Sequence, residues 1–412
     1  MPNKLRKYVW LKRVILNAIV LSFALLWGEA FTVILLPQNV DSKMNILASD
    51  PVIGYIYMPN ASTYEKGREY NALYRINSLG LRDREYGPKK DGVFRVLLLG
   101  DSFSVSHGLA IEDSLSRQME RALQEVADTQ VGTSVKFEVI NTAVGGYSPY
   151  NYWKAYLRWA PVFKPDLVLL GLSPDDYDSS NGELIYIIEN GSRVASFREG
   201  HEPKKRGGNL VRNLRKWLSW NSDFYILLRN FFYYNELVGR LSTKFTPKSE
   251  ARLNQLQQFM LPQPEIILEH WAKSFSYLEK LHESTSADNV ELIIIPIPLK
   301  EEIDAAVFQR TLTACGLKLE QMDINQPLDQ IAAFCRKRNI PLLDPRPAIK
   351  ARNMEVPCYF VYDGHWIPEG IHTAVVSIAH QWSNLHLPPW NKISSREDAE
   401  IKYIGRTAAK YR

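Results

Sequence analysis

The stretch of sequence whose residues are best suited to catalysis is 93–108, which reads VFRVLLLGDSFSVSHG. Its apolar run, residues 96–99, is followed at once by Gly100, Asp101 and Ser102. An apolar run stopped by glycine and small polar residues is typical of a central parallel strand that turns into a helix. We therefore expect Ser102 at the carboxyl end of this strand, where open α/β sheets bind ligands and a helix N-terminus favours an oxyanion. A capped helix without catalysis is the alternative that this stretch alone leaves open.

A serine hydroxyl becomes a good nucleophile when a neighbouring base takes its proton and an acid orients that base. Asp363 and His365 stand two residues apart in the sequence DGHWIPEG near the C-terminus, and we predict a triad of Ser102, His365 and Asp363. In a strand both side chains would face one side, whereas in a loop the spacing does not settle their geometry. His372 is the alternative base, although it is expected on the following helix, where a structural histidine is commoner. His107 follows the nucleophile turn too closely to reach back easily.

Three motifs together make the chain resemble the SGNH, or GDSL-type, hydrolase family over residues 94–382. They are Gly-Asp-Ser with Ser102, NTAVGGY at 141–147 after an apolar strand, and DGHWIPEG at 363–370. The Asp-x-His-Trp form of the third motif resembles membrane-associated members that acetylate or deacetylate exopolysaccharides. By position in the family pattern, the resemblance implies that Gly146 lends an N–H group to the oxyanion hole.

The chain departs from the family pattern at one position of that hole. After the strand at 166–171 the family usually carries Gly-x-Asn-Asp, whose asparagine amide donates to the oxyanion, but this chain has Ser-Pro-Asp-Asp. Asp175 therefore stands with Ser102 and Gly146 in the predicted hole. An ionised carboxylate there would repel the developing charge, and loss of one donor typically costs about 100- to 1,000-fold in rate. The departure puts turnover in doubt without excluding it.

Composition favours one large domain with an insertion rather than several small domains, because 412 residues with 45% hydrophobic residues can bury a full core. The formal net charge of +5 comes from the first thirteen residues, which hold five cationic side chains and no acidic one. The rest of the chain holds 45 basic and 45 acidic residues. A neutral body without a recognition motif argues against nucleic acid as a partner.

The N-terminus predicts a membrane anchor. A basic segment, residues 1–13, precedes an apolar span at 14–36 that is long enough to cross a bilayer core of about 30 Å. A cleaved signal peptide is the competing interpretation. Under the positive-inside rule the N-terminus lies in the cytoplasm and the remainder outside, which in a bacterium is the periplasm. Glu29 within the span is expected either to snorkel or to pair with a partner helix.

The pattern after residue 93 alternates strand and helix and predicts a flavodoxin-like, doubly wound parallel α/β sheet of the SGNH type. The expected strands are 95–99, 136–140, 167–170, 290–297 and 340–343, and the expected helices are 115–127, 149–160, 328–338 and 370–382. The hydrolase domain is placed at 93–385, with a mostly helical cap inserted at 179–286. Residues 37–92 form an extended lead-in packed on this core, its tyrosines interpreted as packing residues, and residues 386–412 form a tail.

The cap carries a basic run beside aromatic residues, from Lys204 to Tyr225. This run could hold an acidic polysaccharide or anionic lipid head groups, and a solvated helix face is the alternative. Of the three cysteines, Cys315 and Cys335 are the pair favoured by proximity, although the sequence cannot fix a disulfide. No Cys or His spacing suggests zinc and no glycine-rich phosphate loop appears, so we expect neither a metal nor a cofactor.

The sequence therefore predicts a membrane-anchored serine esterase or O-acyltransferase. Its expected substrate is an acyl ester, acetyl foremost, of a cell-envelope or exported polysaccharide, and its expected intermediate is acyl-Ser102. Two alternatives belong to other classes. One is a catalytically weakened module that binds acylated glycan, suggested by Asp175. The other is a structural subunit of an envelope polysaccharide assembly, suggested by the anchor and the cap.

Overall fold

A computed structural model describes residues 2–36, 46–67, 69–129, 135–177, 185–189, 191–197, 210–234, 255–361 and 363–389. Residues 204–206 of the predicted basic run, and most of the predicted tail, lie outside these ranges. The chain forms two compact units. The first comprises Met1–Lys43, Lys66–Arg68 and Arg206–Thr246, and the second comprises Met44–Glu65, Glu69–Lys205 and Pro247–Arg412. The two units are described separately below.

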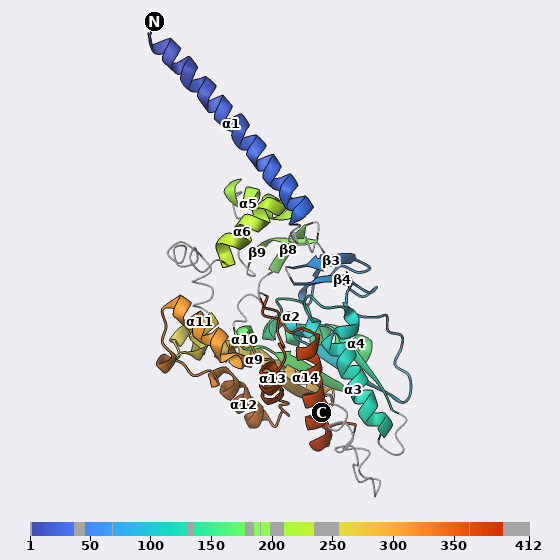
Figure 1. Ribbon diagram of the computed structural model, residues 1–412. Helices are drawn as coiled ribbons and strands as arrows, with labels where there is room; N and C mark the ends of the chain where they lie inside the picture. Colours follow the sequence, from blue (N-terminus) through green and yellow to red (C-terminus); the bar gives the residue numbers. More distant parts are fainter. Residues whose placement is uncertain are drawn as a thin grey trace, which may run out of the picture. The chain divides into compact units, whose positions relative to one another are not determined.

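The second unit is built on a parallel sheet of four strands (Figure 1). These are β5 (Val93–Leu99), β6 (Lys136–Asn141), β7 (Leu167–Leu172) and β10 (Glu291–Pro296), in the spatial order β10-β7-β5-β6. The fifth strand predicted at 340–343 is reduced to a single parallel bridge between Ile294 and Leu342. With this bridge the order matches the flavodoxin-like one, which confirms the predicted doubly wound fold. The strand after β5 in the chain, β6, is added on one side of β5, and the next strand, β7, is added on the other side. The Ser102 turn follows β5, at this reversal of strand order.

Helices cover both faces of the sheet because the strand residues alternate between two cores. Val96 and Leu98 pack with α3 (Leu115–Thr129) and α14 (Pro368–Asn384), which lie side by side in Figure 1. Leu97 and Leu99 pack instead with α4 (Pro149–Phe163), α9 (Glu265–Ala287) and α12 (Gln326–Arg338). Every residue of 96–99 is almost fully buried. This is the pattern expected of a central parallel strand, whose two faces are both covered.

The predicted lead-in packs on the second of these cores through two short hairpins. Its strands are β1 (Leu47–Asp50), β2 (Gly54–Tyr57), β3 (Ser62–Lys66) and β4 (Asn71–Arg75). Buried apolar and aromatic side chains such as Ile53, Tyr55 and Tyr74 belong to the same hydrophobic cluster as Leu97 and Leu99 of β5. The lead-in is therefore part of the folded domain.

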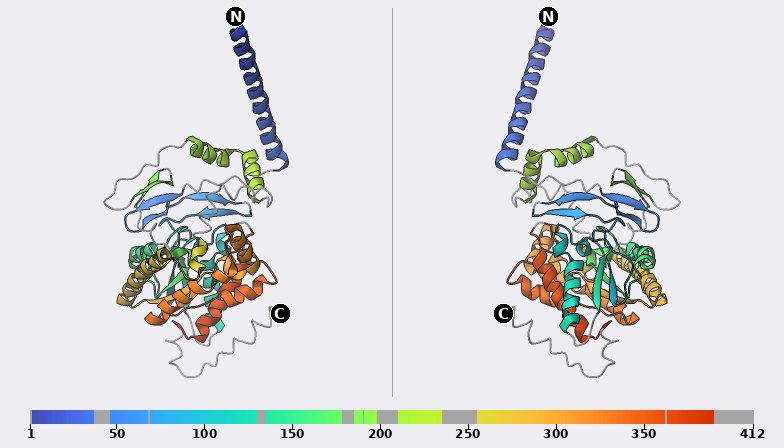
Figure 2. Two further views of the ribbon diagram at one scale, coloured as in Figure 1. Left: turned by 90° about the vertical axis from the view of Figure 1, so that its left-hand side faces the viewer. Right: turned by 90° about the vertical axis from the view of Figure 1, so that its right-hand side faces the viewer.

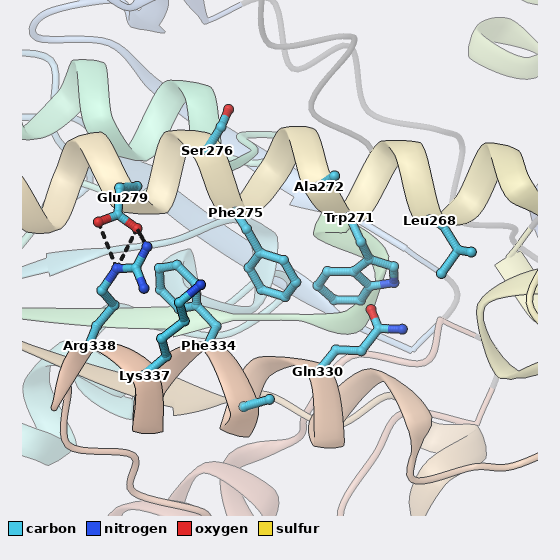
Figure 3. Close-up of a pocket in the computed structure, with 11 residues that line it drawn as sticks. Leu268, Trp271, Ala272, Phe275, Ser276, Glu279, Gln330, Phe334, Lys337 and Arg338 are labelled. Carbon is cyan, nitrogen blue, oxygen red and sulfur yellow. Dashed lines mark hydrogen bonds and ion pairs between the residues drawn. The ribbon is translucent and has the colours of Figure 1, made fainter.

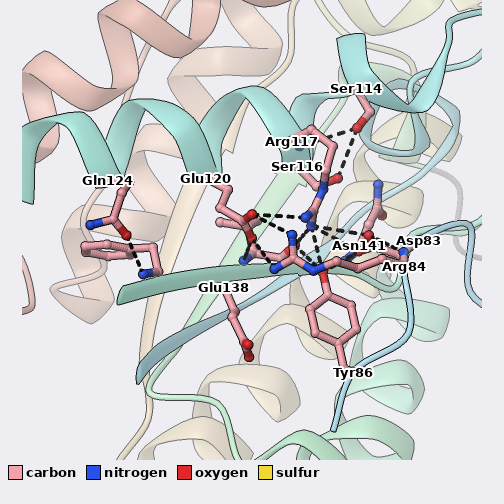
Figure 4. Close-up of polar contacts among 12 residues, drawn as sticks. Asp83, Arg84, Tyr86, Ser114, Ser116, Arg117, Glu120, Gln124, Glu138 and Asn141 are labelled. Atoms are coloured by element: carbon pink, nitrogen blue, oxygen red, sulfur yellow. Dashed lines mark hydrogen bonds and ion pairs between the residues drawn. The ribbon is translucent and has the colours of Figure 1, made fainter. Parts of the chain in front are cut away.

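A polar network fixes the end of the lead-in to α3 and β6 (Figure 4). Arg117 of α3 donates to the Tyr86 hydroxyl at 2.7 Å and lies 3.2 Å from the Asp83 carboxylate. Asp83 in turn accepts from the Asn141 N–H at 2.8 Å. The Asn141 side-chain amide donates to the Ser104 carbonyl at 3.0 Å, on the turn that carries Ser102. The network thus links two of the sequence motifs to one scaffold.

The segment predicted as a mostly helical cap begins with a hairpin. Its strands are β8 (Ile185–Glu189) and β9 (Ser192–Phe197), separated by Asn190-Gly191, a pair of residues typical of tight hairpin turns. Leu47 of β1 donates its N–H to the Gly191 carbonyl at 2.9 Å, so the hairpin extends the lead-in. Helices α5 (Leu210–Asn221) and α6 (Asp223–Tyr234) belong to the first unit, whereas α9 packs against α4 in the second.

The remaining elements in the described part of the second unit are short. They are α2 (Ser102–Val105), η1 (Ile111–Asp113), η2 (Pro174–Tyr177), η4 (Gln257–Phe259), α10 (Lys300–Ile303), α11 (Ala305–Cys315), η5 (Leu319–Gln321) and α13 (Arg346–Asn353). None of the three cysteines, all within the described residues, forms a disulfide, so the favoured pairing of Cys315 with Cys335 is not formed. The physical reason is that Cys315 packs against one hydrophobic core and Cys335 lies within the other, on the opposite face of the sheet.

The first unit contains the long N-terminal helix α1 (Pro2–Leu35) together with α5 and α6. Its stretch Lys12–Leu35, 24 residues long, has the length and apolar composition of a membrane span or of a signal sequence. Most of its large apolar side chains are exposed, as in Leu26 and Trp27. The prediction of one N-terminal apolar helix is thereby confirmed.

Candidate active site

Ser102 lies directly beyond the carboxyl end of the central strand β5, as the sequence predicts. Gly100 permits the sharp turn: its φ is +153°, and a Cβ atom there would come within 2.0 Å of the Ser104 Oγ. The Asp101 carboxylate accepts a hydrogen bond from the Phe103 N–H at 3.0 Å and so begins α2. Because α2 is a single turn of 4 residues, its dipole supports an oxyanion less than a longer helix would.

The three residues of the predicted triad are brought together. Ser102 Oγ lies 2.8 Å from His365 Nε2, and His365 Nδ1 makes a short hydrogen bond with Asp363 Oδ1. The contact with the carboxylate places the imidazole proton on Nδ1 and leaves the Nε2 lone pair facing the serine hydroxyl. The other candidate base, His372, lies exposed on α14. The geometry therefore pairs Ser102 with His365.

Gly364 explains how two side chains separated by one residue meet. Its φ is +90°, a left-handed conformation that glycine adopts without strain. The chain turns back on itself there, and the His365 N–H donates to Asp363 Oδ1 at 3.3 Å. The loop thus aligns Asp363 and His365 without the strand geometry that the spacing alone left open.

Two rings hold the imidazole of His365 in place. The centroids of the Phe103 ring and of the His107 ring each lie 4.6 Å from that of His365. Phe103 is buried and meets Trp366 edge to face at 5.7 Å between ring centroids. Since Phe103 belongs to α2 and Trp366 follows His365, the nucleophile turn and the acid–base loop are packed as one piece.

Behind the triad lies a hydrogen-bonded chain that our reading of the sequence missed. The Tyr70 hydroxyl donates to Asp363 Oδ2 at 3.0 Å and lies 2.8 Å from His107 Nε2. His107 Nδ1 lies 2.9 Å from Glu65 Oε1, and the second Glu65 oxygen accepts from the Gly108 N–H at 2.8 Å. The sequence analysis considered His107 only as a rival base for Ser102 and interpreted the lead-in tyrosines as packing residues. Tyr70 is an exception to the second interpretation, and His107 lies beside Asp363 while His365 bonds to Ser102.

His107 reaches the triad because the chain reverses directly after α2. Ser106 adopts the left-handed conformation, with φ of +63°, and ends the helix. Residues 62–66 read STYEK, a pattern without the polar and apolar alternation that would mark Glu65 as a buried partner. Nothing local connects that segment to His107, which lies about forty residues away, so the partnership depends on tertiary structure.

The charges in this chain alternate. Burial opposes ionisation of Glu65, but the hydrogen bond and charge of His107 outweigh it and lower the pKa of Glu65. Burial likewise opposes a charge on His107, and Glu65 outweighs it and raises the pKa of the imidazole. Asp363 is also partly buried, yet its contacts with His365, His107 and Tyr70 lower its pKa to about 2. An anion, a cation and a second anion therefore follow one another behind His365.

The other side of Ser102 carries the glycine motif. A Cβ atom on Gly145 would lie 3.8 Å from the Ser102 Cβ, so this motif borders the nucleophile. The Gly145 N–H donates to the Tyr57 hydroxyl at 3.4 Å. Gly146, the predicted oxyanion donor, is exposed and has a φ of +81°. Its role as donor stays a prediction.

Asp175 lies on η2, just after β7, and its side chain is exposed. Its carboxylate, together with those of Asp101 and Asp176, forms a group whose oxygens all lie within 4.8 Å of one another. Burial, followed by the charge of Asp175, raises the pKa of Asp101 to about 7. The same two causes, with the charge of Asp101, raise the pKa of Asp176 well above its usual range. The family's asparagine position is thus occupied by an acid that works against its neighbours' ionisation.

Two side-chain groups in the described part of the chain have the spacing of metal ligands. In the first, His107, Asp363 and His365, the relevant atoms already bond to one another or to Ser102 and Tyr70. In the second, the raised pKa values of Asp101 and Asp176 favour protonated carboxyls, which bind cations poorly. The donor atoms in both groups fit hydrogen bonding better than metal coordination.

Comparison with known proteins places the acid–base loop in a family. Residues 260–405 match the model described as "SGNH hydrolase-like domain, acetyltransferase AlgX". This part of the chain is SGNH-type. For residues 260–405 the family prediction is thereby confirmed, and the match supports the broader functional prediction of an acyl hydrolase or acyltransferase of this type. The matched region holds Asp363 and His365, whereas Ser102 and Gly146 lie N-terminal to it.

Solved structures with similar backbones include the following three. They are TesA (11% identity, TM-score 0.36, covering 71% of this chain and 99% of that one), the lipase/acylhydrolase from Enterococcus faecalis (11%, 0.37, 71% and 96%) and the psychrotrophic esterase EstA from Pseudoalteromonas sp. (10%, 0.34, 70% and 98%). A search of curated protein sequences gives no match.

A groove of about 600 Å³ lies away from the triad, between α9 and α12 (Figure 3). Aromatic side chains form its floor: the Phe275 ring stacks on Phe334 at 5.0 Å and on Trp271 at 5.2 Å between centroids. Arg338 and Glu279 close one end through an ion pair. None of the predicted site residues lines this groove.

Proposed function

We propose that the protein is a serine esterase or O-acyltransferase that works through an acyl-Ser102 intermediate. The observation that carries the proposal is the continuous contact from Ser102 Oγ through His365 to Asp363. His365 Nε2 accepts the serine proton as Ser102 attacks the ester carbonyl, and the imidazolium is stabilised by the Asp363 carboxylate. His365 then returns the proton to the leaving alkoxide as the tetrahedral intermediate collapses. The products of this half-reaction are a free alcohol and acyl-Ser102.

The second half-reaction repeats the same proton transfers with a new acceptor. His365 removes a proton from water, or from a sugar hydroxyl, as that oxygen attacks the acyl-enzyme carbonyl. Collapse of the intermediate breaks the bond to Ser102 Oγ, which takes the proton back from His365. Water as acceptor makes the protein an esterase, and a sugar hydroxyl makes it an acyltransferase. We assign oxyanion stabilisation to the N–H groups of Ser102 and Gly146, opposed by Asp175 while that carboxylate is ionised.

We infer that the substrate is an acylated polysaccharide of the cell envelope or one being exported. Support comes from the acetyltransferase in the description of the matching family and from the partly exposed side chains of the triad. We also propose that α1 is an uncleaved anchor, with the basic N-terminus in the cytoplasm and the hydrolase domain on the periplasmic face. An alkaline phosphatase fusion after Asp91 tests the orientation. An inactive fusion would contradict it.

The decisive experiment for the reaction uses the full chain in detergent and an activated acetyl ester such as p-nitrophenyl acetate. We expect burst release of nitrophenol and a mass increase of one acetyl group on the peptide that contains Ser102. Ser102→Ala is the matched control and should show neither. A wild-type protein that binds acetylated polysaccharide but never acquires the acetyl group would favour the second candidate, a glycan-binding module, for which Asp175 is the specific observation.

A further inference from the structure

The corner between α5 and α6 is tied to the apolar helix α1 through one carboxylate. Glu29 Oε1 accepts from the Asp223 N–H at 2.7 Å, and Glu29 Oε2 accepts from the Ser222 hydroxyl at 2.5 Å and the Phe224 N–H at 3.3 Å. Ser222 itself caps the next amide, since its Oγ accepts from the Tyr225 N–H at 3.0 Å. The first three N–H groups of α6 are therefore all satisfied by side chains.

Full capping matters because unsatisfied N–H groups are costly in an apolar environment. Helix α6 can therefore begin where water is scarce. Glu29 loses hydration there, and the positive N-terminal end of the α6 dipole compensates by stabilising its carboxylate. Close packing accompanies the hydrogen bonds. A Cβ atom on Gly28 would lie only 3.1 Å from the Phe224 ring, so the ring packs directly on the α1 backbone.

The position of Glu29 sets the depth of this corner. It lies six residues before Leu35, the last residue of the apolar stretch, which is about 9 Å along the helix. The stretch of 24 residues spans about 36 Å, roughly 6 Å more than a typical hydrocarbon core. If that excess is shared between its two ends, the boundary between acyl chains and head groups lies about 3 Å before Leu35, and Glu29 and the start of α6 lie about 6 Å inside it, within the depth to which interfacial helices bury their apolar face.

Helix α5 ends at this corner and presents an apolar stripe. Leu210, Leu214 and Trp217 follow one another at intervals of four and three residues, which places them on one helix face. They are 81%, 53% and 56% exposed, respectively. Both views of Figure 2 show α5 running crosswise to α1. A helix crosswise to a membrane span lies along the membrane surface, and tryptophan is favoured at that depth.

We propose that α5 is an interfacial helix whose Leu210, Leu214 and Trp217 side chains insert into the lipid leaflet at the C-terminal end of α1. The lipid surface is the occupant of this stripe because the Glu29 cap holds the adjoining corner just inside the membrane boundary. The inference rests on the proposed membrane anchor and is independent of the proposed catalysis. It resolves the two alternatives for Glu29, since the carboxylate pairs with a helix N-terminus instead of snorkelling.

The test places a photoreactive benzoylphenylalanine at single positions of the full chain in vesicles of phosphatidylethanolamine and phosphatidylglycerol. Replacement of Leu214 should give about tenfold more lipid adduct by mass spectrometry than replacement of Ser219, which lies on the opposite face of α5. Phe23, exposed within the span, is the positive control. Equal adduct at 214 and 219 overturns the proposal while the anchor stands. No lipid adduct at 23 overturns the anchor and this inference together.

A second variant tests the Glu29 cap. Glu29→Ala should raise the hydrogen-exchange rates of the Asp223 and Phe224 amides about fivefold or more and lower the lipid adduct at 214 towards that at 219. Ser22→Ala is the matched control, because Ser22 is exposed on the same helix and bonds only to the Ala18 carbonyl within it. Unchanged exchange and unchanged adduct in Glu29→Ala would overturn the role assigned to the cap.

Discussion

The two sides of Ser102 treat an aspartate in opposite ways. On the base side the pKa of Asp363 is lowered to about 2, whereas on the oxyanion side the pKa of Asp101 is raised to about 7. Burial opposes ionisation of both carboxyls; it is the largest cause of the raised pKa of Asp101, whereas at Asp363 favourable partners outweigh it. Asp363 has His365, His107 and the Tyr70 hydroxyl as partners, while Asp101 faces the carboxylate of Asp175. Neighbouring charge decides which of the two stays ionised.

This contrast divides the site into a base side, where each charge has a partner of opposite sign, and an oxyanion side, where acidic groups lie beside one another. Behind His365, opposite charges alternate, and the ring itself is held between Phe103 and His107. Around the predicted oxyanion hole three carboxyl groups lie together instead, and burial and mutual repulsion raise the pKa of Asp101 and Asp176. The negative oxygen of the transition state would lie on this oxyanion side, next to the acidic groups. The structure therefore favours proton transfer more clearly than charge stabilisation, and the following predictions separate these two contributions.

The largest effect should come from breaking the base side. Ser102→Ala and His365→Ala should each lower esterase kcat about 10⁵- to 10⁶-fold, and Asp363→Asn about 10⁴-fold, because the orienting acid matters less than the nucleophile and base. Turnover of p-nitrophenyl acetate measures the effect, and circular dichroism checks the fold. His372→Ala is the matched control and should retain full activity. If His372→Ala abolishes turnover and His365→Ala does not, the base is wrongly assigned.

The next effect concerns stability on the oxyanion side. Since the pKa of Asp101 is raised from about 3.8 to about 7, the folded protein binds a proton between these values that the unfolded chain has lost. The free energy of unfolding therefore falls as the pH rises through this window. Asp101→Asn keeps an oxygen for the Phe103 N–H and removes the charge. It should gain roughly 2–4 kcal/mol of stability over the wild type at about pH 8, and little at about pH 4.

Denaturant unfolding of both proteins at the two pH values, followed by tryptophan fluorescence, measures this difference. Glu125→Gln serves as the control, because Glu125 is exposed on α3 and its replacement should leave the pH dependence unchanged. Parallel stability curves for the wild type and Asp101→Asn would contradict a carboxyl that is protonated near neutral pH.

A smaller effect is expected when the oxyanion side is repaired. Asp175→Asn restores the amide that the family pattern carries and should raise esterase activity about tenfold or more at neutral pH. Asp175→Ala is the matched variant, since it removes the charge without supplying a donor. An equal gain in both variants would show that repulsion alone limits the rate. A loss of activity in both would instead indicate that Asp175 binds substrate.

Local patterns in the sequence were enough to predict the sheet and the triad. The apolar run 96–99 and the motifs around Ser102 and His365 each report their own structure, and the strand–helix alternation orders them. The Glu65–His107–Tyr70 chain could not be predicted this way, because its members meet only after the lead-in folds onto the core. The strand predicted at 340–343 forms only one bridge, and the β8–β9 hairpin was missed, for a different reason: strand pairing depends on neighbouring strands more than on intrinsic preference.

The smallest predicted effect tests whether the alternating charges matter for catalysis. His107 carries a positive charge held by Glu65, and its ring lies 4.6 Å from that of His365 between centroids. A cation there repels the positive charge that His365 acquires when it accepts the serine proton. His107→Gln keeps a hydrogen-bonding side chain but loses the charge. The acid limb of its rate profile should move to higher pH by about 0.5–1 unit, with only a few-fold change at the plateau.

Tyr70→Phe distinguishes this charge effect from simple loss of contact. It breaks the hydrogen bond to Asp363 while leaving the Glu65–His107 pair in place, so the acid limb should stay within about 0.2 unit of the wild type. Arg82, whose charge lowers the pKa of His107, is present in both variants, so it does not bias the comparison. Equal shifts in the two variants would assign the effect to packing behind Asp363, and no shift in His107→Gln would show that the cation is structural. A shift confined to His107→Gln would mean that the base side of the site contributes a fixed positive charge. The carboxyl groups around the predicted oxyanion hole have each other as neighbours instead of such a cation.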